Sequence, residues 1–227
     1  MNSRTILLLT FAETTYMDLI LPIAQAYAEK YTSPEDSLLQ QVNQQTQAHP
    51  HSHMLSGHIQ GKLLELLSLL LKPRRILEIG TFTGYSALCL AKGLTEDGAL
   101  HTIELRKEDA ATAQQNFNLS DTKDKIFLHI GDALEIIPGL GEDWDLVFID
   151  ADKVGYINYY KMVLPRLKKG GVILADNVFF HGEVLQPELK GKNAKAIQAF
   201  NEYIQQDESV EKVMLTVRDG LMLIFKK

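Results

Sequence analysis

Residues 76–86 read Ile-Leu-Glu-Ile-Gly-Thr-Phe-Thr-Gly-Tyr-Ser, and this stretch decides the fold. Its first four residues are a mostly apolar run typical of a buried strand. Gly80 and Gly84 end that run, and apolar residues recur at helical spacing from Tyr85 to Leu94. A strand, a glycine turn and a helix in this order bring backbone N–H groups and the positive end of a helix to one point. The stretch therefore predicts a ligand site at the carboxyl end of a strand in an open α/β sheet.

Two acidic residues indicate which kind of ligand this site binds. Only two glycines are present, so the Gly-x-Gly-x-x-Gly fingerprint is not met and a nicotinamide-dependent dehydrogenase is poorly supported. The Glu78 carboxylate suits a ligand that carries an ammonium group better than one that carries a pyrophosphate. Glu104 lies 24 residues after Gly80, at the end of the second expected strand. An acid there accepts hydrogen bonds from the ribose hydroxyls of an adenosine-type cofactor, and a solvated strand end is the alternative.

Composition limits the class of protein. The chain has 227 residues, 45% of them hydrophobic and 23% charged, as in an ordinary globular enzyme with one substantial core. A net charge of -6 gives no electrostatic footprint for nucleic acid or an anionic membrane. The single cysteine, Cys89, excludes an intrachain disulfide and is expected to be buried. No apolar run is long enough to span a membrane, and we expect a cytoplasmic protein.

The order of the elements predicts a single α/β domain without repeats or linkers. After the glycine turn, strands and helices alternate, which is typical of a parallel sheet. We expect strands at 99–105, 126–130, 146–149 and 172–174, and helices at 107–118, 154–165 and 192–206. Two closing apolar runs, 210–217 and 221–225, flank an Asp-Gly turn and predict an antiparallel hairpin. Before the sheet we expect three helices. The first covers 17–31 with a break at Pro22, and the third covers 57–71. The second has Ser33 as its cap and Pro34 as its first residue, and it ends at Gln47.

Polar residues at the ends of two later strands predict a metal site. Asp150-Ala-Asp152-Lys153 follows one apolar strand and Asp176-Asn177 follows the next. Neighbouring parallel strands end about 5 Å apart, so two carboxylates and one amide oxygen converge. Such hard oxygen donors suit Mg²⁺, Mn²⁺ or Ca²⁺, whereas a turn start and a helix cap are the alternatives. A nearby cation disfavours a charged ammonium, which makes Lys153 a candidate general base as well as a candidate surface lysine.

Three histidines lie close together at His49, His51 and His53. This spacing is compatible with a metal site, but no cysteine or acidic residue occurs within the run. A solvated loop is therefore the favoured interpretation.

The motifs Glu-Ile-Gly-Thr-Phe-Thr-Gly-Tyr-Ser, Gly-Asp-Ala, Ile-Asp-Ala-Asp-Lys, Ala-Asp-Asn-Val and Asp-Gly-Leu occur in this order. Together they resemble those of the cation-dependent O-methyltransferases, the family of catechol and caffeoyl-CoA O-methyltransferases, over residues 30–227. The resemblance implies a class I S-adenosylmethionine-dependent fold. This is a Rossmann-like, seven-stranded and mostly parallel sheet with a reversed terminal strand and helices on both faces. It also implies N-terminal helices at 1–56, a dimer or substrate-lid region, before a methyltransferase domain at 57–227.

The resemblance also implies roles for individual residues. Cofactor contacts would come from Met54, Ser56, Glu78, Gly80, Thr81, Ser86, Glu104, Asp132, Ala133, Asp150 and Asp152. Asp150, Asp176 and Asn177 would bind the metal. Lys153 would be the catalytic lysine beside Asp150, and Lys153, Phe180 and His181 would face the substrate. After Asp176-Asn177 the chain reads Val-Phe-Phe-His-Gly where relatives usually carry a tryptophan, so the acceptor pocket is expected to differ.

The function that the resemblance implies is transfer of the S-adenosylmethionine methyl group to a hydroxyl of a small vicinal-diol aromatic. The reaction would depend on a divalent cation, for which Mg²⁺ is preferred over Mn²⁺ or Ca²⁺. Two alternatives stay open: methylation of hydroxylated uridine in transfer RNA, and a non-catalytic cofactor-binding module. The net charge of -6 disfavours RNA. Relatives are commonly homodimers, which implies a homodimer here by analogy.

Overall fold

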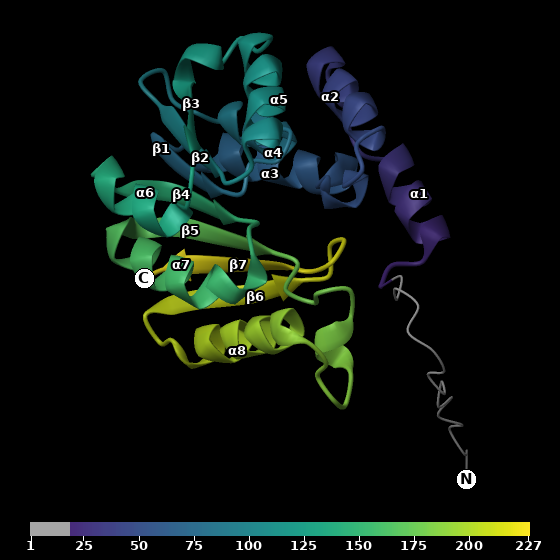
Figure 1. The fold of residues 1–227 in the computed structure, drawn as a ribbon, viewed down its shortest axis with the longest axis vertical. Coiled ribbons are helices and arrows are strands. Elements are labelled where there is room, and N and C mark those ends of the chain that lie inside the picture. The colour runs from purple at the N-terminus through teal and green to yellow at the C-terminus, as the bar shows by residue number, and fades with distance from the viewer. Residues whose placement is uncertain (1–18) are drawn as a thin grey trace.

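The structure, a computed structural model, describes residues 19–227 and confirms the predicted α/β sheet (Figure 1). Seven strands form one sheet in the order β3-β2-β1-β4-β5-β7-β6. Strands β1 to β5 pair in parallel, and β7 runs antiparallel to both β5 and β6. The reversed terminal strand is therefore confirmed, as is the closing hairpin. No helix within residues 19–227 has the length and apolar character needed to cross a membrane.

The strands are β1 Arg75–Ile79, β2 Ala99–Glu104, β3 Ile126–Ile130, β4 Trp144–Ile149, β5 Leu167–Asp176, β6 Val210–Leu215 and β7 Leu221–Lys226. The α-helices are α1 Pro22–Lys30, α2 Ser37–Gln47, α3 Gly57–Leu71, α4 Tyr85–Ala91, α5 Lys107–Asn118, α6 Ala133–Leu140, α7 Tyr156–Val163 and α8 Lys192–Gln206. Short 3₁₀ turns join several of them, among them Ser52–Met54 and Lys153–Gly155.

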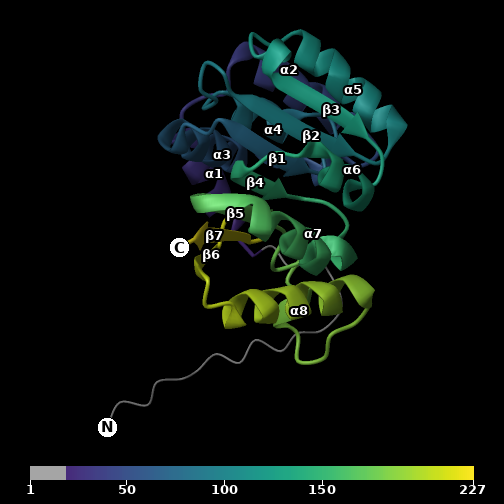
Figure 2. The same ribbon diagram turned by 90° about the vertical axis from the view of Figure 1, so that its left-hand side faces the viewer.

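Helices cover both faces of the sheet, as the two views show (Figure 2). Alternate residues of β4 divide the core, because successive side chains of a strand point to opposite faces. Val147 and Ile149 pack with α6, α7 and α8, whereas Leu146 and Phe148 pack with α2, α3, α4 and α5. Both faces are buried, which is why the strands read as nearly continuous apolar runs.

Several predicted boundaries were wrong. Helix α2 begins at Ser37, because the Asp36 side chain accepts the Leu39 N–H at 2.9 Å and caps the helix; Ser33 and Pro34 lie before it. Pro22 does not break a helix but begins α1, where its missing N–H costs nothing, and residues 17 and 18 of that predicted helix lie outside the described residues. Strand β5 starts at Leu167, five residues earlier than expected.

The glycine turn after β1 is too tight for a side chain at Gly80. Its φ is +97°, and a Cβ there would stand 1.9 Å from the Asp150 carbonyl oxygen. We expect Gly80→Ala to lower the free energy of unfolding by about 2–4 kcal/mol, since strained backbone and a backbone clash coincide. The matched control is Gly139→Ala in α6, where nothing beyond the neighbouring residues and the helix's own backbone lies within 4 Å of the added Cβ. That change is expected to be neutral or stabilising by about 0.4–1 kcal/mol. Urea unfolding measures both, and equal effects would contradict the clash.

Candidate active site

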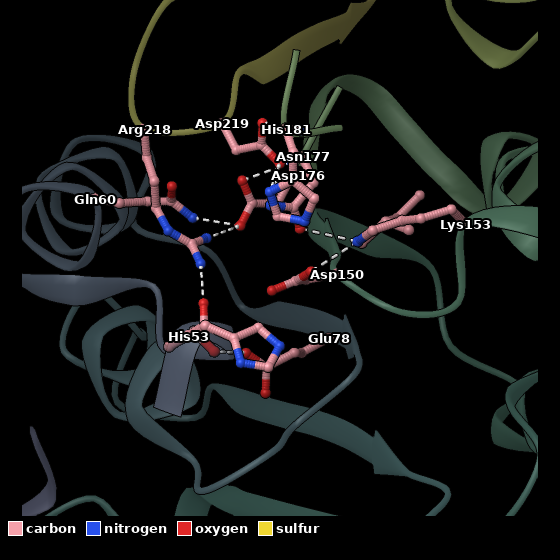
Figure 3. Close-up of polar contacts among 12 residues, drawn as sticks. His53, Gln60, Glu78, Asp150, Lys153, Asp176, Asn177, His181, Arg218 and Asp219 are labelled. Carbon is pink, nitrogen blue, oxygen red and sulfur yellow. Dashed lines mark hydrogen bonds and ion pairs between the residues drawn. The ribbon is translucent and has the colours of Figure 1, made fainter. Parts of the chain in front are cut away.

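A cavity of about 830 Å³ opens at the carboxyl ends of β1, β2, β4 and β5. Most of the predicted site residues line it: Met54, Ser56, Gly80, Thr81, Ser86, Glu104, Asp132, Ala133, Asp150, Asp152, Lys153, Asn177, Phe180 and His181. Two predicted residues lie behind its wall, because the Glu78 and Asp176 side chains are fully buried. The strand-end arrangement predicted from sequence therefore places the candidate residues together (Figure 3).

Strained backbone gathers around this cavity. Six non-glycine residues of the described chain have positive φ, and five of them line the cavity: Phe82, Asn177, Phe180, His181 and Arg218. Left-handed conformations cost free energy for residues with a Cβ, and they concentrate at functional sites in proteins. The clustering marks this cavity as a functional site independently of any motif.

Glu78 is held in a buried hydroxyl network. Its carboxylate accepts hydrogen bonds from Ser86 Oγ at 2.6 Å and from Thr102 Oγ1 at 2.5 Å. Thr102 stands directly opposite Glu78 in the parallel pairing of β1 with β2. Burial raises the pKa of Glu78 to about 8, although the Ser86 and Thr102 hydrogen bonds oppose the shift. A cationic ligand would recover the free energy that this buried carboxylate loses on ionising.

We expect Glu78→Gln to become more stabilising, relative to the wild type, as the pH rises from about 4.5 to above 8. Below pH 4.5 Glu78 is protonated in both states; at higher pH the unfolded chain ionises first, so the wild-type native state loses stability. The gain at the alkaline end is on the order of a few kcal/mol. Urea unfolding without cofactor at several pH values measures it. Glu188→Gln, at an exposed position, is the control, and a flat difference for Glu78→Gln would contradict the buried charge.

Glu104 closes the other side of the glycine turn. Its Oε2 accepts the backbone N–H groups of Thr81 at 3.2 Å and Phe82 at 2.7 Å, and its Oε1 accepts the Arg106 N–H at 2.9 Å. These bonds fix the carboxylate at the cavity wall, with only 6% of the residue exposed. The acid at the end of β2 is therefore a positioned acceptor rather than a solvated strand end.

Lys153 lies among oxygen atoms from three segments of the chain, and Figure 3 shows two of them, at Asp150 and Asn177. Its Nζ donates to Asp150 Oδ1 at 3.1 Å, to Asn177 Oδ1 at 2.9 Å and to the Tyr156 hydroxyl at 2.8 Å. Tyr156 in turn donates to the Asp176 carbonyl oxygen at 2.8 Å. The lysine is therefore held in one position at the cavity wall, and it is not the surface lysine that the sequence left open.

Asp176 has more protein partners than the sequence suggested. Its Oδ1 accepts the Asn177 N–H at 2.8 Å, and its Oδ2 accepts Gln60 Nε2 at 2.7 Å and Arg218 Nη1 at 3.1 Å. Burial and the nearby Asp150 together raise the pKa of Asp176 to about 6, although Arg218 and Lys153 oppose the shift. Asp176 is thus a buried carboxylate that needs positive charge nearby.

The donor set has the chemistry of a site for a hard divalent cation. Within residues 19–227 no group of three or more His, Cys, Asp or Glu side chains is arranged to hold a metal, so the set would consist of two carboxylates and the Asn177 amide. Lys153 Nζ contacts Asp150 Oδ1 at 3.1 Å and Asn177 Oδ1 at 2.9 Å, so these two oxygens face one point. Gln60 Oε1 is a buried acceptor without a partner among the described residues, which a water on a cation could satisfy.

Asp152 and Asp132, two of the predicted cofactor contacts, also make hydrogen bonds that shape the local backbone. Asp152 accepts the Tyr159 hydroxyl and the Gly155 N–H, and it begins the turn that carries Lys153. Asp132 caps α6 by accepting the Leu134 N–H at 2.8 Å. In the histidine cluster His51 and His53 are exposed, as a solvated loop predicts, whereas His49 is half-buried with its Nε2 3.3 Å from Asp109 Oδ1.

Sequence reasoning missed five residues that shape the site: Gln60, Thr102, Tyr156, Arg218 and Asp219. Asp219 accepts Asn177 Nδ2 at 3.0 Å and the His181 N–H at 2.6 Å, and so joins the β6–β7 turn to the end of β5. Asp219 is part of the Asp-Gly turn that the sequence predicted. The expected end of this hairpin beside β5 was the signal that could have identified Asp219 as a site residue. No local pattern identified Gln60 or Arg218.

Comparison with known proteins gives consistent results. Residues 29–227 match the O-methyltransferase family. The chain is 32% identical over 202 residues to the catechol O-methyltransferase of Niastella koreensis, covering 85% of this chain and 91% of that relative. It is 29% identical over 198 residues to a caffeoyl-CoA O-methyltransferase of Stellaria longipes, covering 82% of each. The structure of the O-methyltransferase TomG of Streptomyces achromogenes in complex with SAM has a TM-score of 0.82 at 30% identity, covering 90% of this chain and 96% of TomG.

The sheet order, the glycine turn and the acids at the strand ends define an S-adenosylmethionine-dependent methyltransferase. Within that class the chain belongs to the O-methyltransferase family, because the family match spans almost the whole described chain. The resemblance drawn from the motifs is thereby confirmed, and the dehydrogenase interpretation is set aside.

Proposed function

We propose that this enzyme is a metal-dependent O-methyltransferase that acts on one hydroxyl of a small vicinal-diol aromatic. The observation that carries the proposal is Lys153 Nζ, held between Asp150 and Asn177 at the wall of the cavity. A candidate base and a set of hard oxygen donors thus meet in the cavity that Glu104, at the end of β2, also lines. The names of the catechol and caffeoyl-CoA relatives support an acceptor with adjacent aromatic oxygens.

The residues divide into a cofactor side and an acceptor side. We infer that Glu78 and Ser86 hold the methionine end with Gly80, Thr81 and Asp152 near them, and that Glu104 binds the ribose. Asp132 and Ala133 would face the adenine, with Met54 and Ser56 closing the cavity. Bound S-adenosylmethionine supplies a sulfonium methyl group, and a bound divalent cation supplies the charge that makes an acceptor hydroxyl more acidic.

On the acceptor side, Asp150, Asp176 and Asn177 would hold the cation, with Mg²⁺ preferred over Mn²⁺ or Ca²⁺. In its neutral form Lys153 would take the proton of the reacting hydroxyl, while Phe180 and His181 shape the pocket wall. Methyl transfer between oppositely charged partners neutralises both charges, so positioning and electrostatics supply most of the acceleration.

The test is methyl transfer from S-adenosylmethionine to caffeic acid, with Mg²⁺ and then with EDTA. Turnover that EDTA abolishes and added Mg²⁺ restores is the expected result. Turnover unaffected by EDTA would contradict the metal, and methylation of bulk transfer RNA in place of the catechol would move the acceptor to RNA.

We also propose a homodimer. Helix α1 buries none of its residues, and the side chains Leu21, Ile23, Tyr27 and Tyr31 on and beside it are exposed. Exposed apolar residues along one helix favour an interaction surface. Sedimentation of the full chain tests this, and a monomer at all concentrations would contradict it. The division at residue 56 and the cytoplasmic location stay predictions.

A further inference from the structure

Arg218 places a permanent positive charge against the proposed metal ligand Asp176 (Figure 3). It lies on the turn between β6 and β7, with a left-handed φ of 50°. Its Nη1 donates to Asp176 Oδ2 at 3.1 Å and its Nη2 donates to the His53 carbonyl oxygen at 2.9 Å. The guanidinium therefore links the segment that closes the cofactor cavity to the end of β5.

The hydrogen bonds on Asp176 leave little room for a metal ion. A carboxylate offers about four lone-pair positions, two on each oxygen. Gln60 and Arg218 take both positions on Oδ2, and the Asn177 N–H takes one on Oδ1. Among the described residues, one position on Oδ1 is left for a cation. A divalent ion that binds through Asp176 must use this last position or displace a donor from Oδ2.

The charge of Arg218 also disfavours a metal ion at Asp176, as the number of occupied lone-pair positions does. Asp176 is fully buried, and like charges repel strongly where water is excluded. The Arg218 guanidinium is positively charged and contacts Asp176 directly, so it opposes the binding of a divalent cation there. Without a metal, the same guanidinium stabilises the buried carboxylate.

The surroundings of Arg218 offer it a second position. Besides the main cavity it lines a cavity of about 400 Å³ between α1 and the start of α3. Gln25 and Glu29 of α1 line that second cavity as well. A guanidinium displaced from Asp176 thus has space and a carboxylate on its other side.

We propose that Arg218 competes with the divalent cation for Asp176 and thereby sets a low metal affinity. This inference rests on the proposed metal-dependent function. It makes Arg218 a positioning residue that keeps the ligand Asp176 ordered and paired while the site holds no metal. The cation is then held weakly and exchanges readily, and it is bound more tightly once Arg218 is gone.

The test is calorimetric titration of Mn²⁺ into the full-length chain saturated with S-adenosylmethionine. Arg218→Gln and Arg218→Met remove the charge, and we expect each to bind Mn²⁺ about tenfold more tightly than the wild type. Arg218→Lys keeps a charge and is expected to stay within about threefold of the wild type. Arg166→Gln, which removes a distant exposed arginine, is the matched control for net charge. Circular dichroism shows whether each variant is folded, because Arg218 lines the cofactor cavity and its replacement can change the affinity for S-adenosylmethionine without unfolding the chain.

The outcomes separate the two proposals. If folded Arg218→Gln and Arg218→Met bind Mn²⁺ more tightly than the wild type, or if only they bind it, the competition between Arg218 and the cation is supported. Equal or weaker binding by them overturns the role of Arg218 and leaves the metal site intact. If neither the wild type nor any folded variant binds Mn²⁺, the metal site itself is wrong and the inference falls with it.

Discussion

Replacing Lys153 by methionine is expected to lower kcat for catechol methylation by about 10²–10⁴-fold, the usual contribution of a positioned general base. Methionine keeps the length and apolar character of the side chain but cannot take a proton. The three oxygens that now accept from Nζ would lose their shared donor. Because Lys153 is proposed to act on the acceptor, the affinity for S-adenosylmethionine should change by less than about threefold. Steady-state kinetics and calorimetry measure the two quantities.

Two further variants make this result specific. Lys161→Met removes a lysine of α7 that lies over the Tyr203 ring, away from the cavity, and is expected to leave kcat unchanged. Lys153→Arg keeps the positive charge but cannot act as a base near neutral pH, so it should be nearly as inactive as Lys153→Met. Full activity of Lys153→Arg would show that the charge, rather than proton transfer, is what the reaction needs.

Much of the fold was predictable because the decisive signals are local. Residues 76–86 encode a strand, a turn and a helix within eleven positions, and the structure places them as expected. Helices α3, α5 and α8 begin and end where their apolar spacing predicts. Helix α6 was missed, because Pro138 and Gly139 lie inside it and both are unfavourable in a helix interior. Packing of Ile137 against the sheet compensates for them.

The candidate site was predictable only to the extent that its residues end strands. Glu104, Asp150 and Asp176 follow apolar runs, and a parallel sheet brings such ends to one edge. The partners of Asp176 were not accessible in this way. Gln60 lies 116 residues away in the sequence and Arg218 lies 42 residues away, and only the packing of α3 and the closing hairpin brings them together. Contacts over such separations leave no periodic trace in a single sequence.

Replacing Asp176 by alanine is expected to abolish metal-stimulated turnover, a loss of at least about 10²-fold, while S-adenosylmethionine still binds. The reason is position: Asp176 ends β5 behind the cavity wall, and none of the proposed cofactor contacts comes from β5. Asp176→Asn, which keeps the volume, separates loss of charge from a packing defect and should be nearly as inactive. Turnover with increasing Mg²⁺ and calorimetry with S-adenosylmethionine give the two measurements, and Asp143→Asn at an exposed ion pair is the control.

The pH dependence of metal binding is a second check on the same assignment. Because burial raises the pKa of Asp176 to about 6, its proton competes with a cation below that pH. The affinity of the wild type for Mn²⁺ should therefore fall as the pH drops from 7 to 5. Asp176→Asn has no proton to lose there, so any binding that it retains should fall less steeply. If Asp176→Asn keeps metal-stimulated turnover, or if its metal affinity follows the wild-type pH profile, Asp176 is not a metal ligand and the cation must bind elsewhere along the rim of the sheet.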